Sequence, residues 1–521
     1  MATTANQAVG STTLKRLLAI SAVLVLSPAC DLGGTPAASC PPQFASASGA
    51  AVYVSGACGS DAGDGSQANP LRTIGAAVGR AQTGTTILLG AGTYSEDVKL
   101  PGGVHLVGQG SVRITPQTSG VRVWGEGQST LSGLVIHGAK GDGISVEKTA
   151  VRLEHVTVED TVASASSPGN GVAVDGAPSV ELSACTIRSN AGFGVRVHAS
   201  GTASIIDPLF HGDPRGAATT GAIIDPLFMP SSSIGNNLLG GVAIIDPLFV
   251  PNPAVGFTNL LLHATLIQGN SHYGVLLQGA SANVAHTAVA GTLLAGDVGD
   301  GISVQSRTDE SAEGGNPVLN VDQGSLVLGN ARVGVNIGTF ATATIDGEVS
   351  QSGRGGVWAI GYATTLTLSK TASLLKNTMV GVAVTNGAHL ICNGARIAGT
   401  TPRAVSAGGK TDDMADGIGI YGAAHGAISG ATLADNPRAG IVASKCGTDS
   451  AGNPDVSITG TQITGSKYET VIKCPGTQRA AVGNPKDPSA SSDAGGENAG
   501  VDLIIQDSPC DNGSLDPTCA Q

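Results

Sequence analysis

Aromatic and charged residues are both scarce in this chain of 521 residues: Phe, Trp and Tyr make up 3%, and Asp, Glu, Lys and Arg 13%. An intrinsically disordered chain would carry more charge and fewer aliphatic residues, so the composition excludes that class. Basic residues are outnumbered 27 to 39, which gives a net charge of −12. Because there is also no basic cluster or aromatic stacking platform, the sequence predicts no nucleic-acid partner. We also expect no cofactor.

Glycine, in contrast, is abundant, with 77 residues, and proline adds 25. The strict Gly-X-Y period of a collagen is absent. Apolar residues make up 41% of the chain. This composition favours an all-β protein with many short strands, glycine turns and small aliphatic side chains inside.

The first 30 residues have the order of an export signal. Lys15 and Arg16 precede the apolar run Leu17–Leu26, and small residues lead to Cys30. This resembles a bacterial lipoprotein signal, although Ser27 stands where that pattern has leucine or a similar residue. The run is too short to span a bilayer. We expect a lipoprotein of the cell envelope, lipidated at Cys30 and held at the outer membrane or cell surface. The alternative is ordinary cleavage and secretion.

Nine cysteines fit an oxidising compartment. Three pairs are close in sequence and lie toward the ends of the chain: Cys40 and Cys58, Cys446 and Cys474, and Cys510 and Cys519. We predict disulfides among these six residues, but the spacing does not fix their connectivity. Cys185 and Cys392 lie in apolar, strand-like contexts and are interpreted as buried small hydrophobic residues. No Cys/His cluster indicates a metal, and any metal site is left open.

A glycine followed by alternating apolar residues recurs about every 27 residues. The glycines are Gly143, Gly171, Gly194, Gly221, Gly241, Gly274, Gly301, Gly334, Gly356, Gly381, Gly417 and Gly440. Between them lie further alternating runs such as LEHVTVED and SLVLGN, each ending in a polar turn. Repetition at this period indicates a solenoid, and short β-branched strands indicate a parallel β-helix over residues 51–474.

The segments on either side have a different composition. Residues 31–50 are rich in Ala, Ser, Gly and Pro and are predicted to form a flexible tether. Residues 475–521 read as a linker-like tail, in which Val501–Gln506 is a possible last strand.

Residues 51–110 carry YVS, a GSDAGDGS turn, NPLRTI, LLGAGTY and HLVGQG. This block resembles the start of domain-of-unknown-function family 1565, whose members are right-handed, pectin-lyase-like β-helices; the rest of the chain matches only as generic repeats. The resemblance implies a right-handed parallel β-helix solenoid. On physical grounds, Thr73–Ala81 is expected to be a short amphipathic helix that caps the N-terminal end, which would otherwise expose strand edges.

The hexapeptide IIDPLF occurs three times, at Ile205–Phe210, Ile223–Phe228 and Ile244–Phe249. Because the steps of 18 and 21 residues are close to one coil, we predict that the copies lie in register on adjacent coils. Their phenylalanines would then stack, and Asp-Pro would turn the chain at the same corner each time. A recent duplication is favoured over a selected ligand site.

The alternation also fixes an expected strand orientation. In Gly334–Ile337, Val335 is predicted to point inward and Asn336 outward. Val335→Asp should therefore be strongly destabilising, and Asn336→Asp nearly silent.

Pectin-lyase-like folds often process acidic polysaccharides, so catalytic carboxylates are worth weighing. The nearest arrangement is Asp412, Asp413 and His425, which superficially resembles the Asp-Asp and Gly-His-Gly pattern of polygalacturonases. Ala424 replaces the first glycine, and the other partners of that pattern are missing. We therefore interpret this segment as a polar loop before a strand and assign no catalytic residue.

The other candidate aspartates are also interpreted as turn residues without a catalytic role. Asp142, Asp300 and Asp416 each precede a glycine and are interpreted as corners at which the glycine takes a positive φ. Asp61 and Asp64 could hold calcium, but a turn is favoured.

We expect the protein to bind or display at the cell envelope without catalysis. The expected partners are the membrane, through the lipid anchor, and a glycan or an envelope protein. The alternative is a polysaccharide lyase or glycoside hydrolase, and a structural stalk is a third possibility. The missing catalytic set predicts no depolymerisation of polygalacturonate or alginate.

Overall fold

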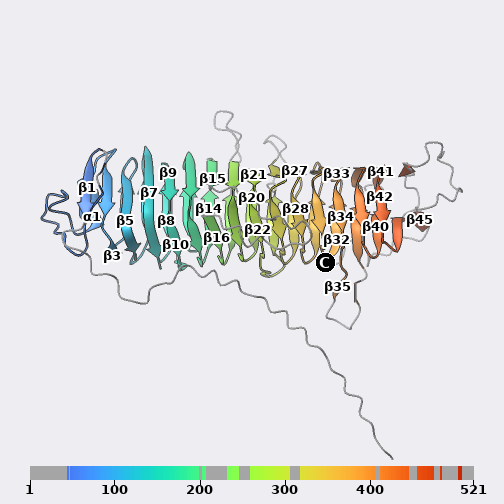
Figure 1. Cartoon of the computed structure of the whole chain (residues 1–521), viewed down its shortest axis with the longest axis horizontal. Coiled ribbons are helices and arrows are strands. Elements are labelled where there is room, and N and C mark those ends of the chain that lie inside the picture. The colour runs from blue at the N-terminus through green and yellow to red at the C-terminus, as the bar shows by residue number, and fades with distance from the viewer. Residues whose placement is uncertain are drawn as a thin grey trace, which may run out of the picture. The chain divides into compact units, whose positions relative to one another are not determined.

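The computed structural model describes residues 44–45, 47, 49–198, 202–206, 232–245, 259–305, 317–404, 411–412, 414–444, 454–473, 482–483 and 503–506. All of them fall in one compact unit, Ser39–Gln521. Nearly all regular structure in this unit is parallel β-strand, as predicted. Figure 1 shows strands of successive coils side by side. Within the described residues, no helix is long and apolar enough to cross a membrane.

One 15-stranded sheet holds one strand from each coil. Its strands are β4 (Val98–Pro101), β6 (Val121–Trp124), β8 (Ile144–Glu147), β11 (Val172–Asp175), β14 (Phe193–His198), β17 (Gly240–Ile245), β20 (Tyr273–Gln278), β23 (Asp300–Gln305), β26 (Val333–Ile337), β29 (Gly355–Ile360), β32 (Met379–Thr385), β37 (Ala415–Tyr421), β40 (Ala439–Ser444), β43 (Tyr468–Lys473) and β45 (Leu503–Gln506). Eleven of these strands, from β8 to β40, are predicted glycine-led runs; β4, β6, β43 and β45 are not, and the run at Gly221 lies outside the described residues.

A 28-stranded sheet contains two ladders joined through the long strands β5 (His105–Ile114) and β7 (Gln128–His137). The first ladder holds β1 (Ala51–Val54), β2 (Thr86–Leu89), β9 (Ala150–Glu154), β12 (Ser179–Ser183), β15 (Thr202–Ile206), β18 (Asn259–His263), β21 (Ser281–Ala285), β24 (Val318–Val321), β27 (Thr342–Ile345), β30 (Thr365–Leu368), β33 (His389–Asn393), β38 (His425–Ser429), β41 (Asp455–Thr459) and β44 (Val482–Gly483).

The second ladder holds β3 (Gly92–Tyr94), β10 (Thr157–Glu159), β13 (Thr186–Arg188), β16 (Ser232–Gly235), β19 (Thr265–Gln268), β22 (Ala288–Ala290), β25 (Leu326–Leu328), β28 (Glu348–Ser350), β31 (Ser373–Leu375), β34 (Arg396–Ala398), β39 (Thr432–Ala434) and β42 (Gln462–Thr464). Each coil therefore visits the 15-stranded sheet, the first ladder and the second ladder in turn. This is the architecture of a parallel β-helix.

Two short elements lie outside this pattern. The helix α1 (Ile74–Val78) is shorter than the predicted Thr73–Ala81, with Thr73 as its N-cap: the Thr73 hydroxyl accepts from the Ala76 N–H at 3.1 Å. Ile74 and Ala77 are fully buried and belong to the core. The strands β35 (Arg403–Ala404) and β36 (Thr411–Asp412) form a separate antiparallel pair between β34 and β37.

Glycine opens the strands of the 15-stranded sheet because a Cβ has no room there. An ideal Cβ on Gly301 would lie 2.6 Å from the carbonyl oxygen of Gly334, on the next coil. On Gly334 it would lie 2.7 Å from the Gly356 oxygen and 2.3 Å from a Val349 methyl carbon. The missing side chain therefore lets each coil close around the core, which explains the repeated glycine in the sequence.

Inside the coils, buried asparagines form a hydrogen-bonded row. Asn190 donates its backbone N–H and its side-chain amide to the Asn237 side-chain oxygen, at 3.1 and 3.0 Å. Asn237 donates in the same way to Asn270, at 3.1 and 2.9 Å. All three are at most 1% exposed. Because each amide satisfies buried backbone groups at a turn, the row fixes the register between coils.

We expect Asn237→Ala to lower the free energy of unfolding by about 3 kcal/mol, because it strands buried donors on Asn190. Asn283→Ala is the matched control. The Asn283 amide oxygen accepts a hydrogen bond from Asn320 at 2.8 Å on the exposed surface, so we expect the free energy of unfolding to fall by only about 0.5 kcal/mol. Urea unfolding followed by circular dichroism measures both. Equal losses in the two variants would contradict a stabilising role for the buried row.

The predicted register of the hexapeptide copies is wrong. Ile205, in the first copy, lies in β15 of the 28-stranded sheet, whereas Ile244, in the third copy, lies in β17 of the 15-stranded sheet. Because Ile205 and Ile244 lie in different sheets, the first and third copies do not occupy the same position on their coils. The second copy and the three phenylalanines lie outside the described residues.

The cysteine predictions can be placed only in part. Cys185 and Cys392 are free and buried, and burial raises the pKa of each thiol to about 11, so both are buried small hydrophobic residues as predicted. Cys30 lies outside the described residues, as do all the disulfide candidates except Cys58. Lipidation and disulfide pairing therefore stay predictions.

Candidate functional site

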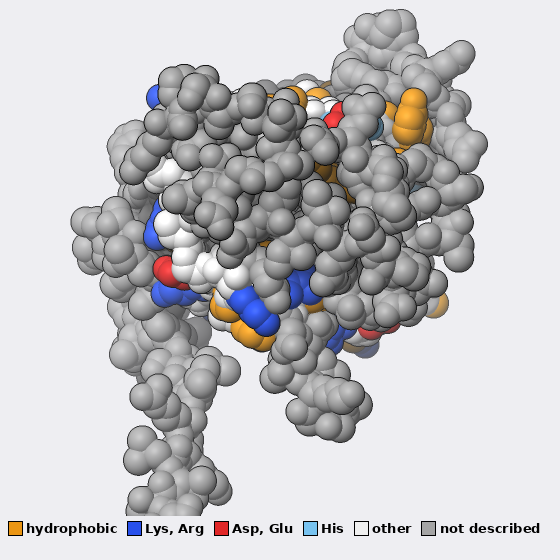
Figure 2. All heavy atoms as spheres, turned by 90° about the vertical axis from the view of Figure 1, so that its right-hand side faces the viewer, with side chains coloured by type: hydrophobic (Ala, Val, Ile, Leu, Met, Phe, Trp, Pro, Cys, Tyr) orange, Lys and Arg blue, Asp and Glu red, His pale blue; other side chains and the backbone are white. Residues whose placement is uncertain are grey.

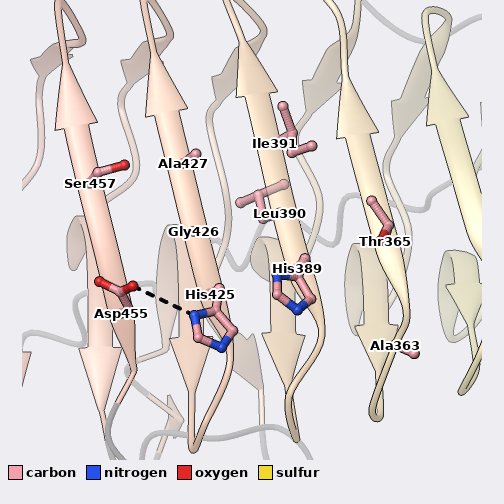
Figure 3. Close-up of a pocket in the computed structure, with 10 residues that line it drawn as sticks. All are labelled: Ala363, Thr365, His389, Leu390, Ile391, His425, Gly426, Ala427, Asp455 and Ser457. Atoms are coloured by element: carbon pink, nitrogen blue, oxygen red, sulfur yellow. Dashed lines mark ion pairs between the residues drawn. The ribbon is translucent and has the colours of Figure 1, made fainter.

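A groove crosses the outer face of the first ladder over β30, β33, β38 and β41 (Figure 3). We call it the histidine groove. It has a volume of about 500 Å³ and is lined by Ala363, Thr365, His389, Leu390, Ile391, His425, Gly426, Ala427, Asp455 and Ser457. Alternate residues of a strand point outward, so each strand contributes a fixed set of side chains to the surface.

Strand register places the polar groups of the groove in one row. Thr365 pairs with His389, His389 with His425, and His425 with Asp455. The two imidazole rings are stacked, with centroids 4.5 Å apart and planes 11° apart. His425 Nδ1 lies 3.6 Å from Asp455 Oδ2, and both side chains are exposed. Hydrogen-bonding groups thus follow one another at the strand spacing of about 4.8 Å.

A second outward row gives the groove its shape. Ile391 pairs with Ala427, and Ala427 with Ser457. The small Ala427 side chain leaves a hollow between Ile391, which is 39% exposed, and Ser457. Tyr362 directly precedes the lining residue Ala363, but it does not itself line the groove, and its ring contacts Phe340 with centroids 6.4 Å apart.

The structure does not bring Asp412 and His425, the two described residues of the polygalacturonase-like sequence pattern, into one sheet. Asp412 lies in β36 of the two-stranded pair, whereas His425 lies in β38 of the 28-stranded sheet. The partner of His425 is Asp455, from the following coil. Asp413 lies outside the described residues.

Sequence reasoning missed His389 and Asp455 as neighbours of His425. The three residues are 36 and 30 positions apart, and unequal coil lengths hide their common register. One sequence feature could have indicated that His389 and His425 are neighbours. Each follows an alanine that ends a turn, in AHLI and AHGA.

Asp300 forms a buried ion pair on the outer face of the 15-stranded sheet. Arg332, on the next coil, reaches its two carboxylate oxygens at 3.0 and 2.7 Å, and Asn336 donates to it at 3.0 Å. The Asp300 side chain is 1% exposed. Burial raises the pKa of this carboxyl above its ordinary value, although Arg332 and Asn336 oppose the shift. The Arg332 guanidinium also lies over the Trp358 ring, 5.2 Å from its centroid.

The same arrangement recurs at Asp416, which is fully buried and bonded to Arg438 of the next coil through Arg438 Nε at 2.7 Å. Neither Gly301 nor Gly417 has a positive φ. The prediction that Asp300 and Asp416 form turn corners is therefore wrong, because both lie in strands. An arginine binds each of these two carboxylates, and both are buried, so neither is accessible from solvent.

Further basic groups surround the first of these pairs. Burial lowers the pKa of the Arg354 guanidinium, and the nearby charges of Arg403 and Arg332 lower it further. In the view toward the C-terminal end of the stack, described basic side chains gather on the lower side, the side on which β35 lies in Figure 1 (Figure 2).

The remaining aspartates that the sequence analysis considered, Asp61, Asp64 and Asp142, accept hydrogen bonds. Asp61 accepts from the backbone N–H groups of Arg72 and Thr73, both at 2.9 Å, just before α1. Burial raises the pKa of Asp61, but these N–H groups outweigh it and leave the pKa below its ordinary value. Asp64 accepts from the Ser66 N–H at 2.9 Å and Asp142 from the Asn170 N–H at 2.9 Å. These contacts agree with the turn interpretation of Asp61 and Asp64. Asp142 accepts a backbone N–H as predicted, but the predicted positive φ at Gly143 is wrong.

Comparisons with known proteins support the fold. Residues 119–287 match the family model described as a right handed beta helix region. No curated protein matches this sequence.

Similar solved structures include pectate lyase Pel9A, with 12% identity, a TM-score of 0.34 and coverage of 66% of this chain and 77% of that one. The A-module of mannuronan C-5 epimerase AlgE4 from Azotobacter vinelandii has 15% identity and a TM-score of 0.29, covering 77% and 90%. The catalytic domain of a GH87 α-1,3-glucanase has 10% identity and a TM-score of 0.34, covering 76% and 64%. Such distant likenesses carry no argument about activity. Together with the strand order, the family match shows that the chain folds as a right-handed parallel β-helix.

Proposed function

We propose that this protein is an exported, lipid-anchored β-helix of the cell envelope that binds a glycan in the histidine groove without cleaving it. The observation that carries the glycan proposal is the row of His389, His425 and Asp455, accessible on successive rigid strands. Strands hold such groups in place before the ligand arrives, so little ordering free energy is lost on binding.

The chemistry of the groove suits a hydroxyl-rich ligand. Imidazole nitrogens and hydroxyls donate and accept hydrogen bonds, the Asp455 carboxylate accepts them, and Ile391 offers apolar surface. Because equivalent positions repeat from coil to coil, an elongated ligand that crosses the strands would meet a similar environment at each step. A polysaccharide is such a ligand.

The anchor at Cys30, the tether over 31–50 and the resemblance of residues 51–110 to family 1565 belong to the same proposal. They rest on the sequence alone. An anchored β-helix would present the groove at the cell envelope, where a glycan or an envelope protein is the expected partner.

A second candidate function is glycan cleavage, by a lyase or hydrolase mechanism. The observation that favours it is the exposed pair of His425 and Asp455, since a carboxylate beside an imidazole orients it as a general base. Among the described lining residues, however, Asp455 is the one carboxylate, and none is Arg or Lys. An inverting hydrolase requires two carboxyl groups, and the groove therefore favours binding.

The test is a glycan array, followed by calorimetry with the best ligand. Ala427→Trp should weaken binding about tenfold or more, because the ring fills the hollow of the groove. The matched control is Leu261→Trp, an exposed outward position in β18 of the same ladder, several coils before the groove, and it should bind like the wild type.

Two outcomes would count against the proposal. Binding that survives Ala427→Trp would place the ligand elsewhere, and an array without any bound glycan would remove the glycan claim. Unsaturated products or new reducing ends that disappear in His425→Ala would establish the catalytic alternative.

A further inference from the structure

A second cluster of polar side chains lies on the outer face of the second ladder, near the N-terminal end. His137 ends β7, and Glu159, which ends β10, is its register partner on the next coil. Asp160 follows directly, with φ of 57°. One ligand atom of each of these three residues lies within 4.8 Å of the others. The cluster therefore combines one imidazole nitrogen with two carboxylates.

The contacts of His137 Nδ1 are unusual for an ion pair. This nitrogen lies 3.4 Å from Glu159 Oε1 and 3.2 Å from Asp160 Oδ2. The atom itself is buried, yet neither contact has hydrogen-bond geometry. A buried ring nitrogen that faces two carboxylates without a hydrogen bond lacks the partner that such an atom normally has.

The separations match those between ligands that share a metal ion. Zinc binds histidine nitrogen and carboxylate oxygen at about 2.0–2.2 Å. Ligands at about 2.1 Å and at angles of 90–110° are then about 3.0–3.4 Å apart. Both distances from His137 Nδ1 fall in this range.

The surroundings orient the carboxylate that would bind. Arg188 holds Glu159 Oε2 at 2.7 Å, and Arg113 reaches Oε1 at 3.3 Å. Groups in this position commonly orient metal ligands, although the two positive charges also weaken cation binding.

We propose that His137, Glu159 and Asp160 bind a zinc ion on this face, with water in the open coordination position. The imidazole ligand favours zinc over calcium and magnesium, which take oxygen ligands and more of them. This site is separate from the histidine groove and does not depend on its function.

Calorimetric titration of the metal-free full chain with ZnCl2 at pH 7.5 tests the proposal. One equivalent of zinc should bind, and CaCl2 should give no comparable binding. Asp160→Asn should weaken zinc binding about tenfold or more; Asn tolerates the left-handed backbone at this position, so the fold is kept. His137→Ala should abolish the binding.

The control is His198→Ala. His198 also contacts a carboxylate, Asp175, at 2.8 Å, but it belongs to no three-ligand group in the described residues. This variant should bind zinc like the wild type. Absence of zinc binding by the wild type, or unchanged binding by Asp160→Asn, would overturn the proposal.

Discussion

Val335→Asp is expected to lower the free energy of unfolding by about 4 kcal/mol or more and to leave little folded protein at 37 °C. Val335 is fully buried between Ile302 and Val357 of the neighbouring coils, as the sequence predicted. An aspartate there either loses its hydration or takes up a proton, and both cost free energy. Urea unfolding at pH 7, followed by circular dichroism, measures the loss.

The matched control is Val318→Asp in β24, where the valine points outward and is 37% exposed. We expect a loss within about 0.5 kcal/mol there. If both substitutions cost the same, the inward and outward assignment of the strands is wrong.

Arg332→Met is expected to destabilise the protein by about 3–5 kcal/mol at pH 7, because it leaves the buried Asp300 carboxylate without the guanidinium nitrogen that donates to both of its oxygens. Methionine keeps much of the side-chain volume over Trp358. Unfolding midpoints in urea at several pH values measure the effect. Asn336 still donates to Asp300, so the variant is expected to fold at acidic pH.

The pH dependence of this variant has a defined sign. The folded-state pKa of Asp300 already lies above its ordinary value, and removal of Arg332 raises it further. The folded state then keeps a proton that the unfolded state has lost, so stability is highest near pH 4 and falls as pH rises through the folded pKa. Equal stability of Arg332→Met at pH 4.5 and pH 7.5 would contradict this account.

The sequence predicted the architecture because the architecture depends on local patterns. Alternation identifies strands, and the glycine before each run marks where a coil closes, as the contacts of Gly334 explain. The inward position of Val335 follows from the same period of two. These features involve a residue and its immediate chain neighbours, so a single sequence contains them.

The side-chain contacts between residues on different coils could not be predicted from the sequence in this way. Asn336 points outward as predicted, but it donates to Asp300, which lies 36 residues earlier, so Asn336→Asp is not expected to be silent. Its effect depends on a contact between coils of unequal length. The stacked His389 and His425 were missed for the same reason. The hexapeptide copies show the opposite error, since their spacing suggested a common register, whereas the first and third copies lie in different sheets.

The order of the strands also determines how the molecule would respond to mechanical force. Among the described strands, each coil is bonded to the coils before and after it, and no strand joins distant coils. A pull on one end would therefore act first on the bonds between the outermost coil and its neighbour, and that coil would detach first. With about 27 residues per coil, each step would release about 90 Å of extended chain. An anchored molecule of this kind would lengthen stepwise under shear and act as an extensible link.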